Sequence, residues 1–338
     1  MASAPSAISF PPATFAKLSP APFVLAHLKP TSSSQSSTRP SGRSPSEFRS
    51  PTINTGSLTH ASGSAVVRIG DTAVVCGVRG EILRASDIPH PYTTSGPGDD
   101  GSKEIEELGL LIPNLELSTG CSPAHLPGNA PSTLAQSLSQ RLLSLLHISK
   151  LVDGRELRIE YQAPQTDDEV PDQPSEVVTK AYWALYIDLL FISLDGNPFD
   201  AAWAAIIAAL RDVRLPNAWW DPDREAVLCS DRVAESKRLN LRGMPIASTF
   251  AVFSTANPQR RREEAEIWVL ADPDGFEEEQ CAETVTIVVA PKQGGKGGVL
   301  RIEKSGGGVV GREEMADLIS QAEDRWSGWE QVLLQERQ

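Results

Sequence analysis

Hydrophobic and polar positions take up a β-strand pattern from about Ile53 onward. Two runs rich in β-branched residues, Ser64 to Ile69 and Thr72 to Val78, are separated only by Gly70-Asp71. Two-residue connections that contain glycine favour tight hairpin turns, so these runs predict a β-hairpin. A long apolar and aromatic run, Ala181 to Leu194, predicts a buried strand.

Helical periodicity appears in three other places. Leucines at helical spacing predict an amphipathic helix over about 131–149. Ala201 to Val213 is apolar almost throughout, which predicts a helix buried on most sides, ended by Pro216. A last helix is expected from about Arg312, with an apolar face of Met315, Leu318, Ile319, Ala322, Trp326, Trp329 and Leu333.

The remaining pattern predicts short strands and polar loops. The expected strands are Leu157 to Tyr161, Pro245 to Thr255, Glu266 to Leu270, Thr284 to Ala290 and Val299 to Glu303. Pro- and Gly-containing stretches at 87–103, 166–176 and 292–298 are expected to be loops. Strict strand–helix alternation is missing, so the order favours an α+β fold in two halves rather than a parallel doubly wound sheet.

This order gives four expected segments. Residues 1–38 form a flexible N-terminal extension with a short docking helix, since Phe15, Leu18, Phe23, Leu25 and Leu28 could pack on a neighbour. Residues 39–215 form the first half, 216–243 a connecting segment and 244–338 the second half. An acid-poor, Ser-rich start also fits an organelle transit peptide, and that alternative stays open.

Charge is distributed unevenly over a chain with a formal net charge of −13. Such a balance argues against a free-standing nucleic-acid binder, because phosphate contacts dominate the affinity of those proteins. Six arginines (39, 43, 49, 68, 79 and 84) nevertheless cluster before residue 85, so the charge does not exclude RNA that passes a local basic patch. The acids of 272–283 are interpreted as a solvated acidic loop, with a magnesium site as the alternative.

Composition excludes several other classes of protein. The longest nearly pure apolar run, Ala201 to Leu210, has ten residues, whereas a membrane helix needs about 20, so no membrane span is expected. The four cysteines (Cys76, Cys121, Cys229 and Cys281) form no CxxC pair and are expected to be free, buried thiols in a reducing compartment. No paired metal-ligand histidines occur, and we expect neither a metal nor a cofactor.

Two short motifs resemble ligand-binding sequences, but neither establishes a ligand-binding site. Gly306 to Gly311 matches GxGxxG, but the residues that follow are expected to be a helix and not the second strand of a dinucleotide site. We therefore interpret it as a strand-to-helix turn. Arg260-Arg261-Arg262 could contact phosphate or an acidic neighbour, or form a solvated turn.

The N-terminal motifs are specific enough to suggest a family. Arg39-Pro40 with Gly42-Arg43, His60-Ala61 with Gly63-Ser64, and Gly70-Asp71-Thr72 together resemble the opening of the RNase PH family. Leu111 to Asn114, Glu116 to Ser118, Cys121 to Pro123, and Leu194 to Asn197 followed by an Ala-rich helix resemble its exosome-ring branch. The resemblance covers about 39–338. It implies an RNase PH-like (ribosomal protein S5 domain 2-like) fold with mixed sheets packed on helices.

The same resemblance implies a degenerate site. Active members cleave RNA by attack of inorganic phosphate, which a hydroxyl, an arginine and backbone N–H groups hold at a helix N-terminus. Where they read Asp-Gly-Gly-Thr-Arg-Thr, this chain has Asn197, Pro198, Phe199 and Asp200 after Asp195-Gly196. We expect the negative charge of Asp200 to repel an anion there.

Two further differences concern other parts of that site. The region 124–140, which matches an Arg-rich helix segment of active members, has no Lys or Arg. Val285 aligns with the main acidic position of active members and Glu279 with its neighbour, and valine can neither transfer a proton nor bind a metal. No catalytic residue is therefore expected.

The resemblance thus implies a non-catalytic subunit of the RNA exosome ring. Its expected partners are other RNase PH-like ring subunits, S1/KH cap subunits, a hydrolytic exoribonuclease and the RNA that passes through the channel, without a membrane. The expected compartments are nucleus, nucleolus and cytoplasm. Two alternatives stay open: an active phosphate-dependent 3′-to-5′ exoribonuclease, and an interaction module outside the exosome that uses residues 1–30.

Overall fold

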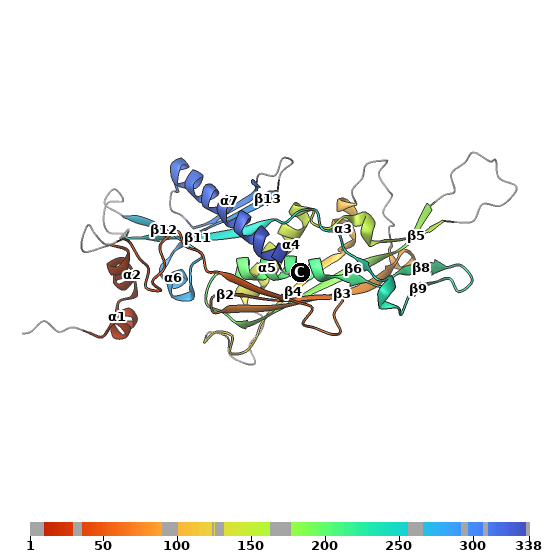
Figure 1. Ribbon diagram of the computed structural model, residues 1–338, viewed down its shortest axis with the longest axis horizontal. Helices are drawn as coiled ribbons and strands as arrows, with labels where there is room; N and C mark the ends of the chain where they lie inside the picture. The colour runs from red at the N-terminus through yellow and green to blue at the C-terminus, as the bar shows by residue number, and fades with distance from the viewer. Residues whose placement is uncertain are drawn as a thin grey trace, which may run out of the picture.

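The computed structural model is elongated, with two large β-sheets, two further two-stranded sheets, and helices packed between and over the large sheets (Figure 1). It describes residues 10–29, 36–89, 101–123, 125, 132–162, 177–255, 266–291, 297–306 and 310–335. The expected loops at 166–176 and most of 292–298, the Arg260–Arg262 cluster and the centre of the GxGxxG motif lie outside these residues.

The first sheet is built around one long strand. Its strands are β1 (Pro51–Thr55), β2 (Gly63–Ile69), β3 (Thr72–Arg84), β4 (Leu111–Leu117), β5 (Arg158–Gln162) and β6 (Val177–Ser193). The order is β1-β2-β3-β6-β4, and β5 also pairs with β6. Only the pairing of β4 with β6 is parallel. The predicted hairpin is confirmed, because Ile69 faces Thr72 across Gly70-Asp71.

The second sheet is antiparallel throughout. Its strands are β11 (Ile246–Ser254), β12 (Ile267–Ala271), β13 (Glu283–Pro291) and β14 (Gly297–Ser305), in the order β12-β11-β13-β14. The four strands predicted after Pro245 are confirmed, each within two residues at either end. The α+β prediction is therefore correct for both sheets.

Short elements fill the segment expected to connect the two halves. β7 (Arg214–Leu215) pairs with β10 (Lys237–Arg238), and β8 (Ala218–Asp221) pairs with β9 (Ala226–Cys229). The 3₁₀ turn η3 (Val233–Glu235) lies in the same segment, whereas the 3₁₀ turns η1 (Ala85–Asp87) and η2 (Gly154–Leu157) lie in the first half. The sequence did not reveal these strands, because runs of two to four residues are too short for a period to show.

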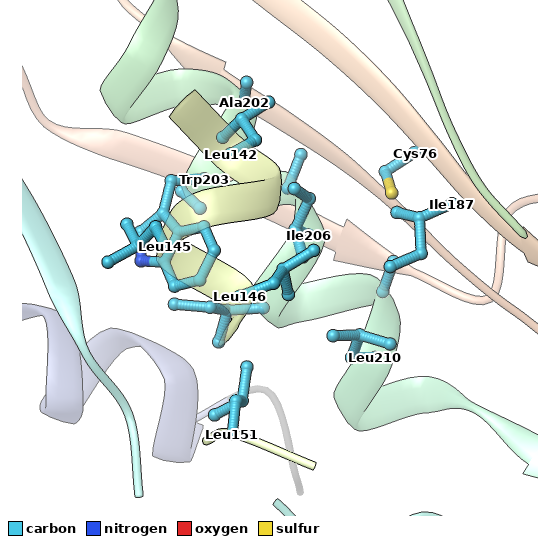
Figure 2. Packing of buried hydrophobic residues seen from close by; sticks show 14 of the residues in the cluster. Cys76, Leu142, Leu145, Leu146, Leu151, Ile187, Ala202, Trp203, Ile206 and Leu210 are labelled. Carbon is cyan, nitrogen blue, oxygen red and sulfur yellow. The ribbon is translucent and has the colours of Figure 1, made fainter. Parts of the chain in front are cut away.

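Helix α5 (Pro198–Asp212) lies at the centre of the molecule, in contact with β2 and β3 of the first sheet and β11 of the second. All twelve residues from Phe199 to Leu210 are buried, which explains why its sequence is apolar on every side. Figure 2 shows Trp203 and Ile206 of α5 beside Leu142, Leu145 and Leu146 of α4 (Thr133–Ser149), with Leu210 further along α5 near Ile187. The predictions of α4 and α5 are confirmed.

The remaining helices cover the outside. In α7 (Arg312–Gln335), Leu318, Ala322, Trp326 and Trp329 are buried as predicted, and the Leu333 side chain lies outside the described part. α3 (Ser102–Leu108) begins inside the stretch expected to be a loop, and α6 (Gly275–Gln280) lies inside the expected acidic loop. Among the described helices none is long and apolar enough to cross a membrane.

The N-terminal segment forms two short helices, α1 (Pro12–Leu18) and α2 (Pro20–Leu28). Val24 and Leu28 of α2 are buried against Phe253 and Leu270 of the second sheet. Docking of this segment on a neighbour stays a prediction; within the chain, α2 packs on the second sheet. The cysteine prediction needs correction, since all four are free but Cys229 is exposed and Cys281 only half-buried.

Candidate functional site

The turn between β6 and α5 brings together four of the residues singled out from the sequence. Gly196 and Asn197 have φ angles of 70° and 48°, a region that favours glycine and tolerates asparagine. Thr72 fixes the turn, because its Oγ1 accepts from the Asp195 amide and donates to the Gly196 carbonyl, both at 2.9 Å. Pro198 takes the first position of α5, where its missing N–H costs least.

Gly196 also lies against the segment that precedes α6. A Cβ at this position would stand 2.4 Å from the Asp274 carbonyl carbon and 2.6 Å from the Gly275 nitrogen. Segments 195–197 and 273–275 are therefore in direct backbone contact. This contact places the acidic residues that follow β12 beside the N-terminus of α5.

Asp200 is buried in the first turn of α5 and fully hydrogen-bonded. Its Oδ2 accepts from the Thr249 amide at 3.0 Å and from Asn197 Nδ2 at 2.9 Å, and its Oδ1 accepts from Thr249 Oγ1 at 2.7 Å. Arg325 of α7 pairs with the same carboxylate. Arg325 thus pairs with the charge of Asp200 within the protein, and the expected repulsion of an anion by Asp200 stays a prediction.

Phe199 and Arg141 form the other side of this turn. The Arg141 guanidinium carbon lies 4.2 Å from the centre of the Phe199 ring, a cation–π contact. Arg141 Nε also lies 2.9 Å from Glu303 Oε1, and its Nη2 lies 3.4 Å from Thr286 Oγ1. Arg141 lies within the helix predicted over about 131–149, but it was given no role because the segment considered for cations ended at residue 140.

Val285 does not belong to the group of side chains around the β6–α5 turn. It is fully buried in β13 and faces Phe250 across the sheet. The adjacent Thr286 reaches the turn instead, 3.0 Å from Thr249 Oγ1. Glu279 is exposed on α6. The absence of a catalytic role for Val285 therefore stays a prediction based on the resemblance.

The anion-favouring N-terminus of α5 already holds carboxylates of the protein. Glu278 Oε1 accepts from the Asn197 amide at 2.7 Å, and Asp272 Oδ1 accepts from Asn197 Nδ2 at 2.6 Å. Burial raises the pKa of the Glu278 carboxyl to about 7. Since a helix N-terminus offers unpaired amides and a positive dipole end, these side chains occupy the position that suits an external anion.

Asp272 is held by Arg49 from the other end of the chain. Asp272 Oδ2 accepts from the Arg49 amide and Nε, both at 2.9 Å, and Oδ1 accepts from Nη2 at 2.8 Å. Burial alone would raise the pKa of this carboxyl, but the hydrogen bonds from Arg49 and the charges of Arg325 and Arg49 hold it well below its usual range. Asp272 is therefore an ionised carboxylate with no exposed surface.

Arg39 forms a second buried pair. Its guanidinium lies 3.1 Å from Glu277 Oε2 and donates to the carbonyls of Ala271 and Glu47 at 2.6 Å. Burial lowers the pKa of Arg39 from its ordinary value and raises that of Glu277. We call this network the ionic junction; it comprises Arg39, Arg43, Arg49, Arg325, Asp200, Asp272 and Glu277.

The ionic junction corrects one expectation from the sequence and narrows another. Asp272 and Glu277 have no exposed surface, so the stretch 272–283 is not a solvated acidic loop. Arg39 and Arg49 bind carboxylates inside the protein and cannot contact RNA, whereas Arg68 and Arg79 remain exposed. In the described part of the chain no group of three or more His, Cys, Asp or Glu side chains is arranged to hold a metal.

Comparison with known proteins agrees with this architecture. A family model described as "3′ exoribonuclease family, domain 1" (RNase PH) matches residues 47–216. The chain belongs to the RNase PH family. The family match begins near Arg49 of the ionic junction, ends after α5 and includes the whole β6–α5 turn.

Two relatives show that the similarity extends over nearly the full length of this protein. Exosome complex component rrp43 of Schizosaccharomyces pombe is 33% identical, over 89% of this chain and 90% of the relative. Exosome complex component Rrp42 of Methanothermobacter thermautotrophicus is 27% identical, over 84% of this chain and 85% of the relative.

A solved structure confirms the expected RNase PH-like fold. A chain of the Archaeoglobus fulgidus exosome with RNA bound to the active site superposes with a TM-score of 0.63 at 23% identity, over 92% of this chain and 96% of that chain. At this identity the likeness concerns the fold alone.

Proposed function

We propose that this protein is a non-catalytic ring subunit of an RNA exosome, which supports 3′-to-5′ RNA processing and degradation without cleaving RNA itself. The similarity to exosome components named rrp43 and Rrp42 supports the assignment to the complex. The occupied N-terminus of α5 supports the lack of catalysis.

The observation that carries the inert assignment is the pairing of Glu278 with the Asn197 amide at 2.7 Å. Phosphorolysis requires inorganic phosphate at this helix N-terminus, which here already binds a carboxylate. Pro198 supplies neither hydroxyl nor N–H, and Phe199 replaces a cation with a buried ring. An incoming phosphate would have to displace Glu278 and lie beside Asp200 and Asp272, each already paired with an arginine.

In this role the protein shapes the ring and leaves catalysis to others. Its partners are other RNase PH-like subunits, S1/KH cap subunits and a hydrolytic exoribonuclease that receives RNA through the channel. Such a complex works in the nucleus, nucleolus and cytoplasm, where it processes rRNA and degrades RNA. The active-phosphorolysis alternative is not favoured, since no part of the described turn offers phosphate a hydroxyl or an unpaired cation.

The test is a purification of the tagged protein from its own cells, with the eluate assayed on 3′-labelled RNA with and without phosphate. We expect five other RNase PH-like subunits in the eluate and degradation that does not depend on phosphate. A lone protein or homo-oligomer that releases nucleoside diphosphates only when phosphate is added would contradict the proposal.

A further inference from the structure

A cavity of about 660 Å³ opens where β5, β6, β7 and β10 meet, and none of the residues of the β6–α5 turn line it. Figure 1 places β5, with β8 and β9, at one end of the molecule, opposite α1 and α2. The residues that matter for its chemistry are Arg158, Trp183, Leu215, Lys237, Arg238 and Leu239.

The cavity is locally basic on an acidic chain. Four cations line it, Arg155, Arg158, Lys237 and Arg238, against two acids, Glu156 and Glu160, whereas the whole chain carries −13. Lys237 and Arg238 are exposed. Within the described residues, neither side chain forms an ion pair. A local excess of unpaired cations attracts a partner of opposite charge.

Arg158 contributes an unsatisfied group at this site. Its Nε donates to Glu104 Oε2 at 2.8 Å, and only 9% of its side chain is exposed. Its Nη2 is buried and has no hydrogen-bond acceptor among the described residues. A buried donor without an acceptor is unfavourable, so Arg158 keeps hydrogen-bonding capacity next to the cavity that Glu104 does not satisfy.

Part of the remaining lining is apolar, beside the polar Asn217 and Asn240. Ile159, Trp183, Leu215 and Leu239 contribute to the wall. Trp183 is only 7% exposed, so little of its ring surface is available for base stacking. This part of the cavity suits an aliphatic side chain.

We propose that this cavity is the docking site for a segment of a neighbouring RNase PH-like ring subunit that presents a carboxylate beside an aliphatic side chain. The carboxylate binds the exposed Lys237 and Arg238 at the rim, and the aliphatic group packs beside Leu215 and Leu239. RNA fits less well, because a polyanion gains affinity from many phosphates, and here Glu156, Glu160 and the net negative charge oppose it. This inference rests on the proposed ring function and identifies the chemistry of one contact in it.

The experiment compares two charge-reversal pairs in the reconstituted complex. Lys237→Glu with Arg238→Glu changes the rim of the cavity. Arg224→Glu with Arg232→Glu makes the same change of charge on exposed residues of the same segment that do not line it. Binding of the RNase PH-like subunits is measured by mass photometry over a dilution series. Carbodiimide coupling, which joins a lysine to a carboxylate only in direct contact, is mapped at Lys237.

We expect the cavity pair to weaken binding of one neighbour at least tenfold, the control pair to change it less than twofold, and Lys237 to couple to an Asp or Glu of that neighbour. If both double variants bind the neighbours as tightly as wild type does, and Lys237 stays uncoupled in an intact ring, the cavity proposal is wrong. The proposed ring function would not be affected by that result. Photo-cross-linking of bound RNA to residues 155–160 or 237–240 would also overturn the cavity proposal, in favour of an RNA site. Failure of the wild-type protein to bind any RNase PH-like subunit would instead contradict the ring function.

Discussion

Arg49 and Asp272 lie 223 residues apart in the sequence and are joined by three hydrogen bonds, two from the guanidinium and one from the amide. The pair fixes the segment before β1 to the end of β12, so it connects the first sheet to the second. Asn197 Nδ2 also donates to Asp272 at 2.6 Å. Asp272, which the sequence placed in a solvated loop, therefore anchors the N-terminus of the central helix α5.

Removal of the Asp272 carboxylate should strongly destabilise the fold. Asp272→Ala leaves Arg49 buried without its anion, and loss of one partner of a buried ion pair costs about 3–5 kcal/mol. The measurement is the shift of the urea unfolding transition. Asp71→Ala is the control, because Asp71 pairs with Arg68 on the surface and such pairs contribute about 0–1 kcal/mol. Equal shifts for the two variants would show that the ionic junction is not structural.

The sequence predicted the strands, turns and helices that depend on local pattern. It did not predict the contacts between residues that lie far apart in the chain. The hairpin at Gly70-Asp71 and the buried helix α5 follow from turn chemistry and periodicity within a few residues. The burial of Asp272 and Glu277 could not be found in this way, because their partners Arg49 and Arg39 lie over 220 residues away. Both arginines were noticed, but their charge was considered for RNA and not for these acids.

Gly196 should tolerate no side chain. A Cβ there would lie 2.4 Å from backbone of residue 274 in addition to the strain of a φ of 70°. Gly109 separates the two effects, since its φ is 61° but nothing lies within 4 Å of its Cβ position. Left-handed strain alone costs roughly 1–2 kcal/mol, so Gly109→Ala should lose about that much and Gly196→Ala clearly more. Urea unfolding of the two variants measures the difference, and losses of equal size would argue against the backbone contact.

Glu278 should make stability depend on pH near neutrality. Its native pKa is about 7 because of burial, against an ordinary value of 4.5. Between these values the native state binds a proton that the unfolded chain has lost, so the contribution to stability is full below pH 4.5 and is lost as the pH rises through about 7. Glu278→Gln removes this titration and keeps an oxygen acceptor for the Asn197 amide.

The free energy of unfolding of Glu278→Gln, relative to wild type, should therefore rise between pH 5 and pH 8. A rise of roughly 1–3 kcal/mol is expected after allowance for partial solvent screening. Urea titrations at four pH values measure it. Glu279→Gln, at the exposed neighbouring position, provides the matched control and should show no such trend. A difference between Glu278→Gln and wild type that stays constant with pH would contradict the assignment.

Leu28 should hold the N-terminal helices on the second sheet. It is 1% exposed and packs with Val24, Phe253 and Leu270, and burial of one leucine contributes about 1.5–3 kcal/mol. A charge at this position cannot enter that contact, so Leu28→Asp should release α1 and α2 and leave the two sheets folded. Leu18→Asp is the control, because Leu18 is 65% exposed.

Hydrogen exchange of residues 12–28 distinguishes these outcomes. The amides of α2 should lose protection at least about tenfold in Leu28→Asp, because detachment leaves a nine-residue helix that is too short to persist alone in water. The amides of β11 should keep their protection, since they bond to β12 and β13 on either side. Protection of α2 that survives in Leu28→Asp would mean that other contacts, such as the edge-on packing of Phe23 against Phe276, suffice to hold the helix.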